Sequence, residues 1–197
     1  MTPGPELWTD RLHLRRWTAA DLRPFAALNA DPEVMEYFPS TLSTEEVRVF
    51  IERVEAAFED RGFSWWAVDT RHDGDFVGMV GLGRVGADYP FGPAVETGWR
   101  LARTAWGQGY AVEAARAALT YGFTALDLEE IVAFTTVANR RSRAVMDRLG
   151  MSHDPADDFD HPHLAAGHPL RPHVLYRLDR RRWVAGGGTG AAADPPR

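Results

Sequence analysis

Two glycines separated by one residue stand where a strand pattern gives way to a helix pattern. Residues 106–111 read Trp-Gly-Gln-Gly-Tyr-Ala, after an apolar run over 95–101 and before a helical run that ends near Phe123. Glycine lets the backbone turn tightly and approach a ligand closely. The first amides of a helix lack intrahelical partners and carry partial positive charge, which suits a phosphate. The pattern indicates a site for a phosphorylated ligand, although a plain helix-start turn has the same signature.

The composition excludes several other phosphate-binding and catalytic devices. All 22 basic residues are arginine, so there is no lysine for a Walker loop, a kinase strand or a Schiff base. A dinucleotide fingerprint requires Gly or Ala where this chain has Val112, and no acidic residue ends a second βα unit at the right distance. The absence of cysteine excludes thiol nucleophiles, iron–sulfur clusters and disulfides.

The residues around the glycine turn follow a recognisable order. Glu-Thr-Gly-Trp at 96–99 precedes the turn, and a strand pattern over 131–137, Asn-Arg-Arg-Ser at 139–142 and a helix ending in Leu-Gly-Met at 149–151 follow it. This order resembles the GNAT superfamily of acyl-CoA-dependent N-acyltransferases, and within it the branch of RimJ/RimL-like ribosomal-protein N-terminal acetyltransferases. Thr-Asp-Arg-Leu-His-Leu-Arg at 9–15 and Asp-Pro-Glu-Val-Met at 31–35 resemble the same branch. The likeness extends over about residues 7–183.

The resemblance implies a fold and a cosubstrate. The fold is a GNAT-type α/β (α+β) structure with a mixed, mostly antiparallel central sheet flanked by helices, and acetyl-CoA is the acyl donor, with no metal. In such enzymes one strand pairs with the pantetheine arm and the turn amides hold the pyrophosphate. The corresponding cofactor-binding residues are Trp99, Arg100, Leu101, Gly107, Gln108, Gly109, Tyr110, Ala111, Asn139 and Ser142. One departure is Thr104, where the family often has Gln or Arg, so no side-chain contribution is expected there.

Amide formation from a thioester requires a neutral amine, a stabilised oxyanion and a protonated leaving thiolate, but no covalent nucleophile. The resemblance assigns proton donation to Ser142, whose alternative is a helix N-cap. It assigns the general base to Glu96, whose alternatives are an ion pair with an arginine or simple exposure. Asn139 binds pantetheine by the same resemblance or is a plain turn residue.

A histidine- and aspartate-rich segment follows over residues 153–168. Its side chains could suggest a metal, but zinc ligands usually come from ordered elements at defined spacings, and these lie among prolines. We interpret the segment as a loop that lines the acceptor groove and attracts a cationic amine by its acidity. Its candidate residues are Asp154, Asp157, Asp158, Asp160, His161 and His163. Arginines 140, 141, 143 and 148 either flank the 3′-phosphate of CoA or form a solvated helix face.

The remaining pattern predicts the elements that position these residues. Strands are expected over 11–17, 63–68, 76–85, 94–101, 131–137 and 173–178, with a hairpin turn at Asp73-Gly74 and one short strand near Met151. Helices are expected from the Thr18 cap through Asn29 and from the Ser43 cap to Gly62, besides the two already described. The predicted order is βααβββαβαβ.

Length and charge bound the remaining possibilities. At 197 residues and 22.0 kDa we expect one domain over 1–184 and a disordered Gly/Ala/Pro tail over 185–197. A formal charge of −6 argues against nucleic acid, and no apolar run approaches the ~20 residues of a membrane span. Residues 1–6 lack signal-peptide features, so a cytoplasmic protein is expected. A homodimer is compatible with the sequence.

These observations favour an acyl-CoA-dependent N-acyltransferase that transfers acetyl directly to a primary amine, on a protein N-terminus or a small molecule. Three alternatives stay open: a non-catalytic acyl-CoA sensor, a small amine such as an antibiotic or polyamine as acceptor, and a succinyl-CoA-type donor. The groove that selects the acceptor is built from loops, so sequence patterns do not choose among acceptors.

Overall fold

One mixed sheet organises the part of the chain that the computed structural model describes, residues 5–188. Its strand order is β1-β2-β3-β4-β5-β6-β9-β7, and β8 pairs with β9. The strands are β1 (Leu7–Trp8), β2 (Leu12–Arg15), β3 (Trp65–Thr70), β4 (Phe76–Val85), β5 (Ala94–Leu101), β6 (Glu130–Thr136), β7 (Ser152–His153), β8 (Phe159–Asp160) and β9 (Pro172–Asp179). The helices are α1 (Leu22–Ala30), α2 (Thr44–Arg61), α3 (Tyr110–Thr124), α4 (Arg140–Arg148) and α5 (Arg180–Ala185).

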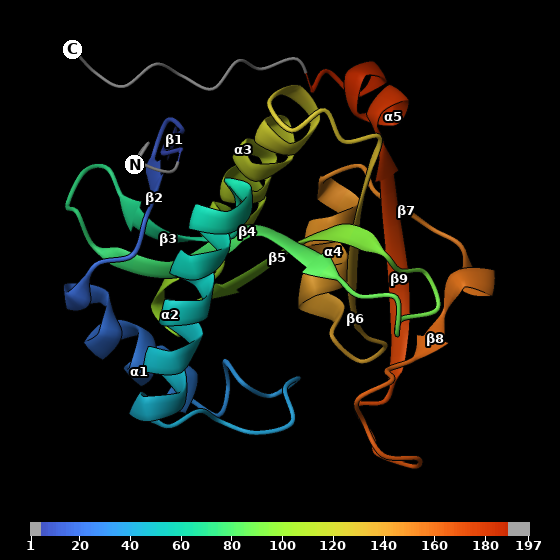
Figure 1. Cartoon of the computed structure of the whole chain (residues 1–197), viewed down its shortest axis with the longest axis horizontal. Helices are drawn as coiled ribbons and strands as arrows, with labels where there is room; N and C mark the ends of the chain where they lie inside the picture. The colour runs from blue at the N-terminus through green and yellow to red at the C-terminus, as the bar shows by residue number, and fades with distance from the viewer. Residues whose placement is uncertain (1–4, 189–197) are drawn as a thin grey trace.

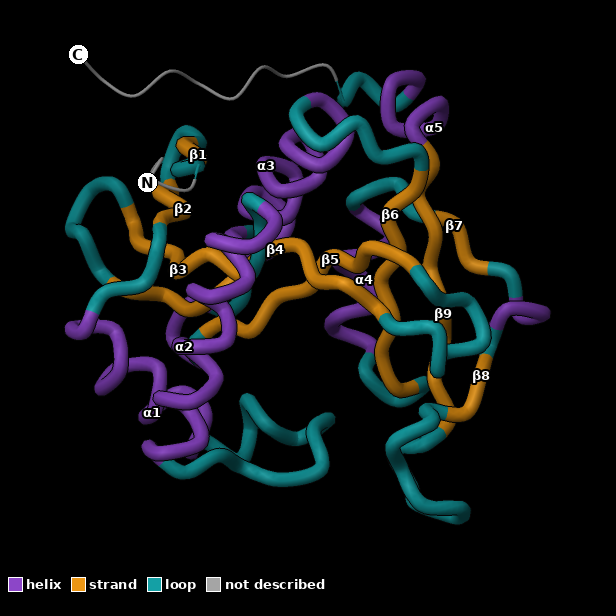
Figure 2. Tube along the Cα trace, viewed as in Figure 1, coloured by secondary structure: helices purple, strands orange, loops and turns teal. Residues whose placement is uncertain are grey.

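All strand pairs are antiparallel except β5 and β6, which run parallel. These two strands share a single registered pair, Glu96 with Val132, and then separate. Figures 1 and 2 show the result: β1–β4 lie on one side with α1 and α2, and β6–β9 lie on the other. The predicted mixed, mostly antiparallel GNAT-type sheet flanked by helices is confirmed.

Helix α3 packs closely on the sheet because its inner face carries small residues. Ala114, Ala115 and Ala118 are fully buried. A Cβ added to Gly122 would lie 2.6 Å from Ile131 Cδ1 of β6, closer than packed side chains allow. The helix that follows the glycine turn is therefore held against β4, β5 and β6, so its N-terminus has a fixed place beside the opening between β5 and β6.

The second helix begins and ends where the sequence predicted. The Ser43 side chain accepts a hydrogen bond from the Glu46 amide, and the Glu46 carboxylate accepts one from the Ser43 amide, which forms a capping box. Gly62 ends α2 in the left-handed region with φ 78°. Val47, Val54 and Phe58 are buried along one face of the helix, at the spacing of an amphipathic helix.

Sequence patterns missed three short elements, β1, β8 and α5, because segments of two to six residues carry little periodicity. The first predicted helix is also interrupted: Thr18 caps a 3-10 turn over Ala19–Asp21, and α1 begins at Leu22. Of the predicted tail, Ala185 ends α5 and residues 186–188 are described; the rest lies outside the described residues. Within residues 5–188, no helix is both long enough and apolar enough to span a membrane.

Candidate active site

The glycine turn presents free backbone amides at the start of α3. Gly107 and Gly109 have φ of 77° and 79°, a region in which L side chains are strained. Within residues 5–188, the N–H groups of Gly107, Gln108 and Gly109 donate no hydrogen bond. Consecutive free amides at a helix N-terminus form a concave site for an anion. The geometry therefore fits the phosphate of the predicted cosubstrate.

The edge of β5 beside this turn is open. Its other edge pairs with β4 through the whole strand, Ala94 to Leu101. Toward β6, among the described residues, no partner is registered beyond Glu96. Backbone groups of Trp99–Leu101 on this edge, apart from the Leu101 carbonyl, are therefore available to an extended ligand. The Trp106 indole donates to the Leu101 carbonyl at 3.0 Å, which fixes the end of β5 to the turn.

The start of α4 holds Asn139 and Ser142 together. Asn139 is the N-cap: its Oδ1 accepts from the Ser142 amide at 3.1 Å, and its Nδ2 donates to the Ser142 hydroxyl at 3.1 Å and the Thr135 hydroxyl at 3.0 Å. The alternative of Ser142 as the helix N-cap is wrong, because Asn139 is the cap and Ser142 is the third residue of α4. With capping done by Asn139, the half-buried Ser142 hydroxyl accepts a hydrogen bond and keeps its own proton to donate.

The first turn of α4 also contacts the glycine turn. The Arg141 guanidinium lies 4.5 Å from the centre of the Trp106 indole and pairs with Glu36 at 2.6 Å. Arg143 and Arg148 donate to main-chain carbonyls. Contact of the α4 arginines with a 3′-phosphate stays a prediction, but Arg141 does bring the predicted turn and the Asn139–Ser142 pair into one region.

Glu96 lies on the sheet face that borders the divergence of β5 and β6. Its carboxylate reaches toward Gly83 of β4, where an added Cβ would lie 3.2 Å from Glu96 Oε1 and 2.5 Å from Trp65. Within residues 5–188 it forms no ion pair or hydrogen bond, so the predicted alternative of a pair with arginine is not observed. Desolvation by burial raises the Glu96 pKa to about 7. A carboxylate that is half ionised near neutral pH suits a general base.

Aromatic side chains from the β4–β5 loop, β6 and β8 gather next to Glu96. Strands β5 and β6 are parallel, and Glu96 is in register with Val132, so these two side chains project from the same face of the sheet. Phe134 lies two residues after Val132 and therefore projects from that face as well. Burial raises the Tyr89 pKa, and the negative charge of Glu96 raises it further, as expected for close neighbours. Neighbouring rings have their centres 5.0–6.2 Å apart among Tyr89, Phe91, Phe134 and Phe159.

His161 completes this aromatic cluster, defined here as Tyr89, Phe91, Phe134, Phe159 and His161. Its Nε2 lies 3.1 Å from the Tyr89 hydroxyl. Burial, with smaller contributions from His173 and His163, lowers the His161 pKa to about 4, so the imidazole is neutral at pH 7. Its Nδ1 accepts from the His163 amide at 3.3 Å, which favours the tautomer with the proton on Nε2. The Tyr89 hydroxyl proton is then available to another acceptor.

The aspartates predicted to attract the amine are instead engaged within the protein. Asp157 pairs with Arg177 at 2.7 Å, and Asp158 pairs with His153 at 2.7 Å. Asp154 caps a 3-10 turn, and Asp160 pairs with Arg171 at 3.2 Å. Among the described residues, no group of three or more His, Cys, Asp or Glu is arranged to hold a metal. Phe159 and His161 thus place this loop in the aromatic cluster, while its carboxylates form contacts within the protein.

Arg100 is a cofactor candidate whose side chain has another environment. It extends from β5 and donates a hydrogen bond to the side chain of Asn29 in α1. Its guanidinium carbon lies 4.1 Å from the centre of the Phe38 ring. Its Nε is buried and has no hydrogen-bond partner among the described residues. Burial lowers the Arg100 pKa to about 10, so the side chain stays charged at pH 7. No carboxylate pairs with it within residues 5–188.

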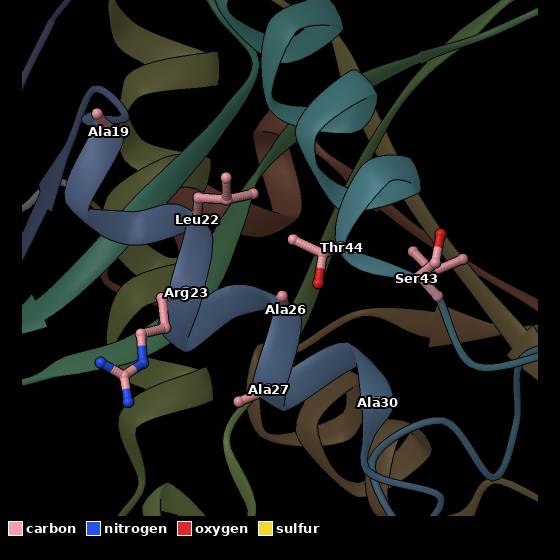
Figure 3. A pocket seen from close by; sticks show the side chains of 9 residues that line it. Ala19, Leu22, Arg23, Ala26, Ala27, Ala30, Ser43 and Thr44 are labelled. Carbon is pink, nitrogen blue, oxygen red and sulfur yellow. The ribbon is translucent and has the colours of Figure 1, made fainter.

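A surface pocket lies elsewhere, between α1 and the start of α2. Figure 3 shows its lining of small side chains with Arg23 at the margin. The pocket has a volume of about 510 Å³ and contains none of the predicted site residues. The candidate site is therefore the opening between β5 and β6, not this pocket.

Comparison with known proteins decides the family. Residues 11–152 match the family described as Acetyltransferase (GNAT) domain. The chain belongs to the GNAT acetyltransferase family. This GNAT protein is 34% identical over 192 residues to the FsC-acetyl coenzyme A-N(2)-transacetylase of Aspergillus fumigatus, covering 91% of this chain and 78% of the relative. It is 32% identical over 152 residues to the uncharacterized protein YkkB of Bacillus subtilis, covering 77% and 87%.

A solved structure supports the same assignment. An acetyltransferase from Agrobacterium tumefaciens superposes on this GNAT protein with a TM-score of 0.73 at 27% identity, covering 89% of this chain and 95% of the other. The protein is thus an N-acetyltransferase whose fold binds acetyl-CoA as a substrate. The free amides at Gly107–Gly109 and the open edge of β5 fit such a substrate.

Proposed function

We propose that this enzyme transfers the acetyl group of acetyl-CoA directly to a primary amine, with Glu96 as general base and Ser142 as general acid. The observation that carries the proposal is the carboxylate of Glu96, which is desolvated, unpaired among the described residues, and lies at the divergence of β5 and β6. A carboxylate whose pKa is raised to about 7 can accept a proton from an ammonium group, and no ion pair within the protein competes for it among the described residues.

Each proton in the reaction has a destination. The acceptor arrives as an ammonium ion and gives one proton to Glu96, directly or through water, which frees the nitrogen lone pair. The nitrogen–carbon bond then forms and the carbon–sulfur bond breaks. The sulfur leaves as a thiolate and takes a proton from the Ser142 hydroxyl. As the amide forms, the nitrogen loses a second proton, and one proton returns to Ser142 to restore its hydroxyl.

The surroundings of Glu96 favour an amine attached to an apolar group. Aromatic faces attract ammonium ions and also pack against apolar neighbours, and the aromatic cluster and Trp65 lie on either side of the carboxylate. The loop aspartates, which would attract a polyamine, are already paired. We infer an acceptor with one amino group beside an apolar or aromatic group. A protein N-terminus of the kind modified by RimJ/RimL-like enzymes meets this description.

Arg100 favours a second candidate, transfer of an acidic acyl group such as succinyl. The half-buried guanidinium is charged at pH 7 and bonded to a neutral amide, and its buried Nε has no partner among the described residues. A carboxylate on the acyl donor would satisfy it.

One panel separates these possibilities. Purified protein is assayed with acetyl-CoA and with succinyl-CoA against a peptide N-terminus, phenethylamine and spermidine, following thiol release and acceptor mass. The proposal predicts acetylation of the first two acceptors with higher kcat/KM than spermidine. A preference for spermidine contradicts the acceptor class, and a preference for succinyl-CoA selects the second candidate. Binding of CoA with no turnover of any amine would support the acyl-CoA sensor instead.

A further inference from the structure

The opening motif of the chain, Thr-Asp-Arg at 9–11, lies against the glycine turn although about a hundred residues separate them. The Arg11 side chain reaches Glu113 in the first turn of α3: Nε donates to Oε2 at 2.7 Å, and Nη2 lies 2.6 Å from the same oxygen. The Arg11 amide and the Thr9 hydroxyl donate to the other carboxylate oxygen at 2.9 Å and 2.5 Å. Glu113 thus receives four contacts from a three-residue segment.

The third nitrogen of Arg11 acts on the turn itself. Nη1 donates to the Gln108 carbonyl at 2.9 Å, and the guanidinium carbon lies 4.8 Å from the centre of the Tyr110 ring. An added Cβ on Gly109 would lie 3.4 Å from Nη2. All three guanidinium nitrogens therefore have partners inside the protein, and these contacts connect the N-terminal segment to the turn and to the first turn of α3.

The contact with the Gln108 carbonyl fixes a peptide plane. In a trans peptide the C=O and the following N–H point in opposite directions, and the Gln108–Gly109 bond is trans. A carbonyl directed at Arg11 therefore directs the Gly109 N–H away from Arg11. That amide is one of the three that donate no hydrogen bond within residues 5–188. Glycine on the C-terminal side leaves this plane free to rotate when nothing holds it.

We propose that Arg11, braced by Glu113 and Thr9, is a positioning residue for the acyl donor: it sets the Gln108–Gly109 peptide so that the Gly109 amide faces the pyrophosphate. The proposal rests on the proposed use of acetyl-CoA. It assigns a role to the N-terminal segment that neither the glycine turn nor the proton-transfer residues explain.

Arg16 supplies a matched control. It also pairs with a helix carboxylate, Glu55, at 2.6 Å, and its guanidinium carbon also lies 4.8 Å from an aromatic ring, that of Phe58. It contacts no residue of the glycine turn among its described partners. Arg16→Ala therefore removes the same kind of interaction from the same end of the chain without touching the Gln108–Gly109 peptide.

The experiment measures CoA affinity by calorimetry and melting temperature on the same preparations of wild type, Arg11→Ala, Arg11→Lys and Arg16→Ala. Loss of an orienting hydrogen bond predicts a rise in CoA Kd of about tenfold or more for Arg11→Ala. Arg11→Lys should bind CoA no more tightly than Arg11→Ala does, because one ammonium group cannot reach both Glu113 and the Gln108 carbonyl. Arg16→Ala should lower the melting temperature and leave CoA Kd unchanged.

Three outcomes overturn the proposal: unchanged CoA Kd in Arg11→Ala, equal weakening in Arg16→Ala, or full rescue by Arg11→Lys, which would indicate simple attraction between charges. An amide NMR spectrum adds a direct readout. The Gly109 N–H should shift downfield with CoA in wild type and not in Arg11→Ala. If the wild type itself fails to bind CoA, the proposed donor is wrong, and the role of Arg11 falls with it; unchanged binding in the variant contradicts the positioning role alone.

Discussion

Replacing Glu96 by Gln tests the raised pKa and the base role with one substitution. The native carboxyl titrates near pH 7 because burial disfavours its charge, against an ordinary value of 4.5. Between these values the native state holds a proton that the unfolded chain has released, so native stability falls as pH rises through this window. The full difference corresponds to about 3 kcal/mol, of which about 2.5 kcal/mol falls between pH 5 and pH 8.

Glutamine has the same shape and never ionises, so it removes this pH dependence. We compare the free energy of unfolding of Glu96→Gln with that of wild type. The difference, variant minus wild type, should increase by about 2.5 kcal/mol from pH 5 to pH 8. In the same variant kcat should fall by about 10²-fold, and the acidic limb of the wild-type profile, with an apparent pKa near 7, should disappear.

Urea unfolding at both pH values and a pH series of kcat on the same preparations provide the measurements. Glu129→Gln, which removes an exposed carboxylate outside the site, is the control and should change neither quantity. A stability difference that is equal at pH 5 and pH 8 would refute the raised pKa. An unchanged kcat profile would refute the base role and leave Glu96 as an acceptor-orienting group.

Four further variants address other parts of the site. Gly109→Val forces a branched residue into the left-handed region at φ 79° and should weaken CoA binding by about 3 kcal/mol; calorimetry on a folded variant with unchanged affinity would contradict the turn assignment. Ser142→Ala should lower kcat by about 10²-fold with little change in melting temperature. Asn139→Ala should cost about 1 kcal/mol of stability because Asn139 is the cap. A Ser142→Ala variant that loses stability and keeps its kcat would exclude proton donation by Ser142. Asp157→Asn with Asp158→Asn should cost up to about 1 kcal/mol through the lost ion pairs and leave acceptor KM unchanged; a salt-sensitive rise in KM would restore the electrostatic role of the loop.

The elements nearest the chemistry were predictable because their signals are local. The predicted strand over 94–101 has the bounds of β5. The two glycines predicted a turn with special backbone angles, and both have positive φ. The Ser43 cap and the glycine at the end of α2 were equally explicit. Each of these features depends on a few adjacent residues, so sequence spacing contains the information.

The contacts between distant segments were not predictable in the same way. The Thr-Asp-Arg motif is visible in the sequence, but nothing in the spacing connects Arg11 with its partner Glu113. The acidity of the 154–160 loop was visible, yet its aspartates pair with Arg177 and His153. The choice between Asn139 and Ser142 as the cap depends on where α4 begins, a boundary that patterns locate only within a turn.

Mass balance tests whether the enzyme transfers acetyl to a primary amine at the opening between β5 and β6. Purified enzyme is incubated with acetyl-CoA and a peptide with an apolar first residue, and free CoA and acetylated peptide are quantified at intervals. We expect equal amounts of the two products at every time, and a parallel fall of both in Glu96→Gln. CoA release without acetylated peptide, or equal turnover by Glu96→Gln, would contradict it.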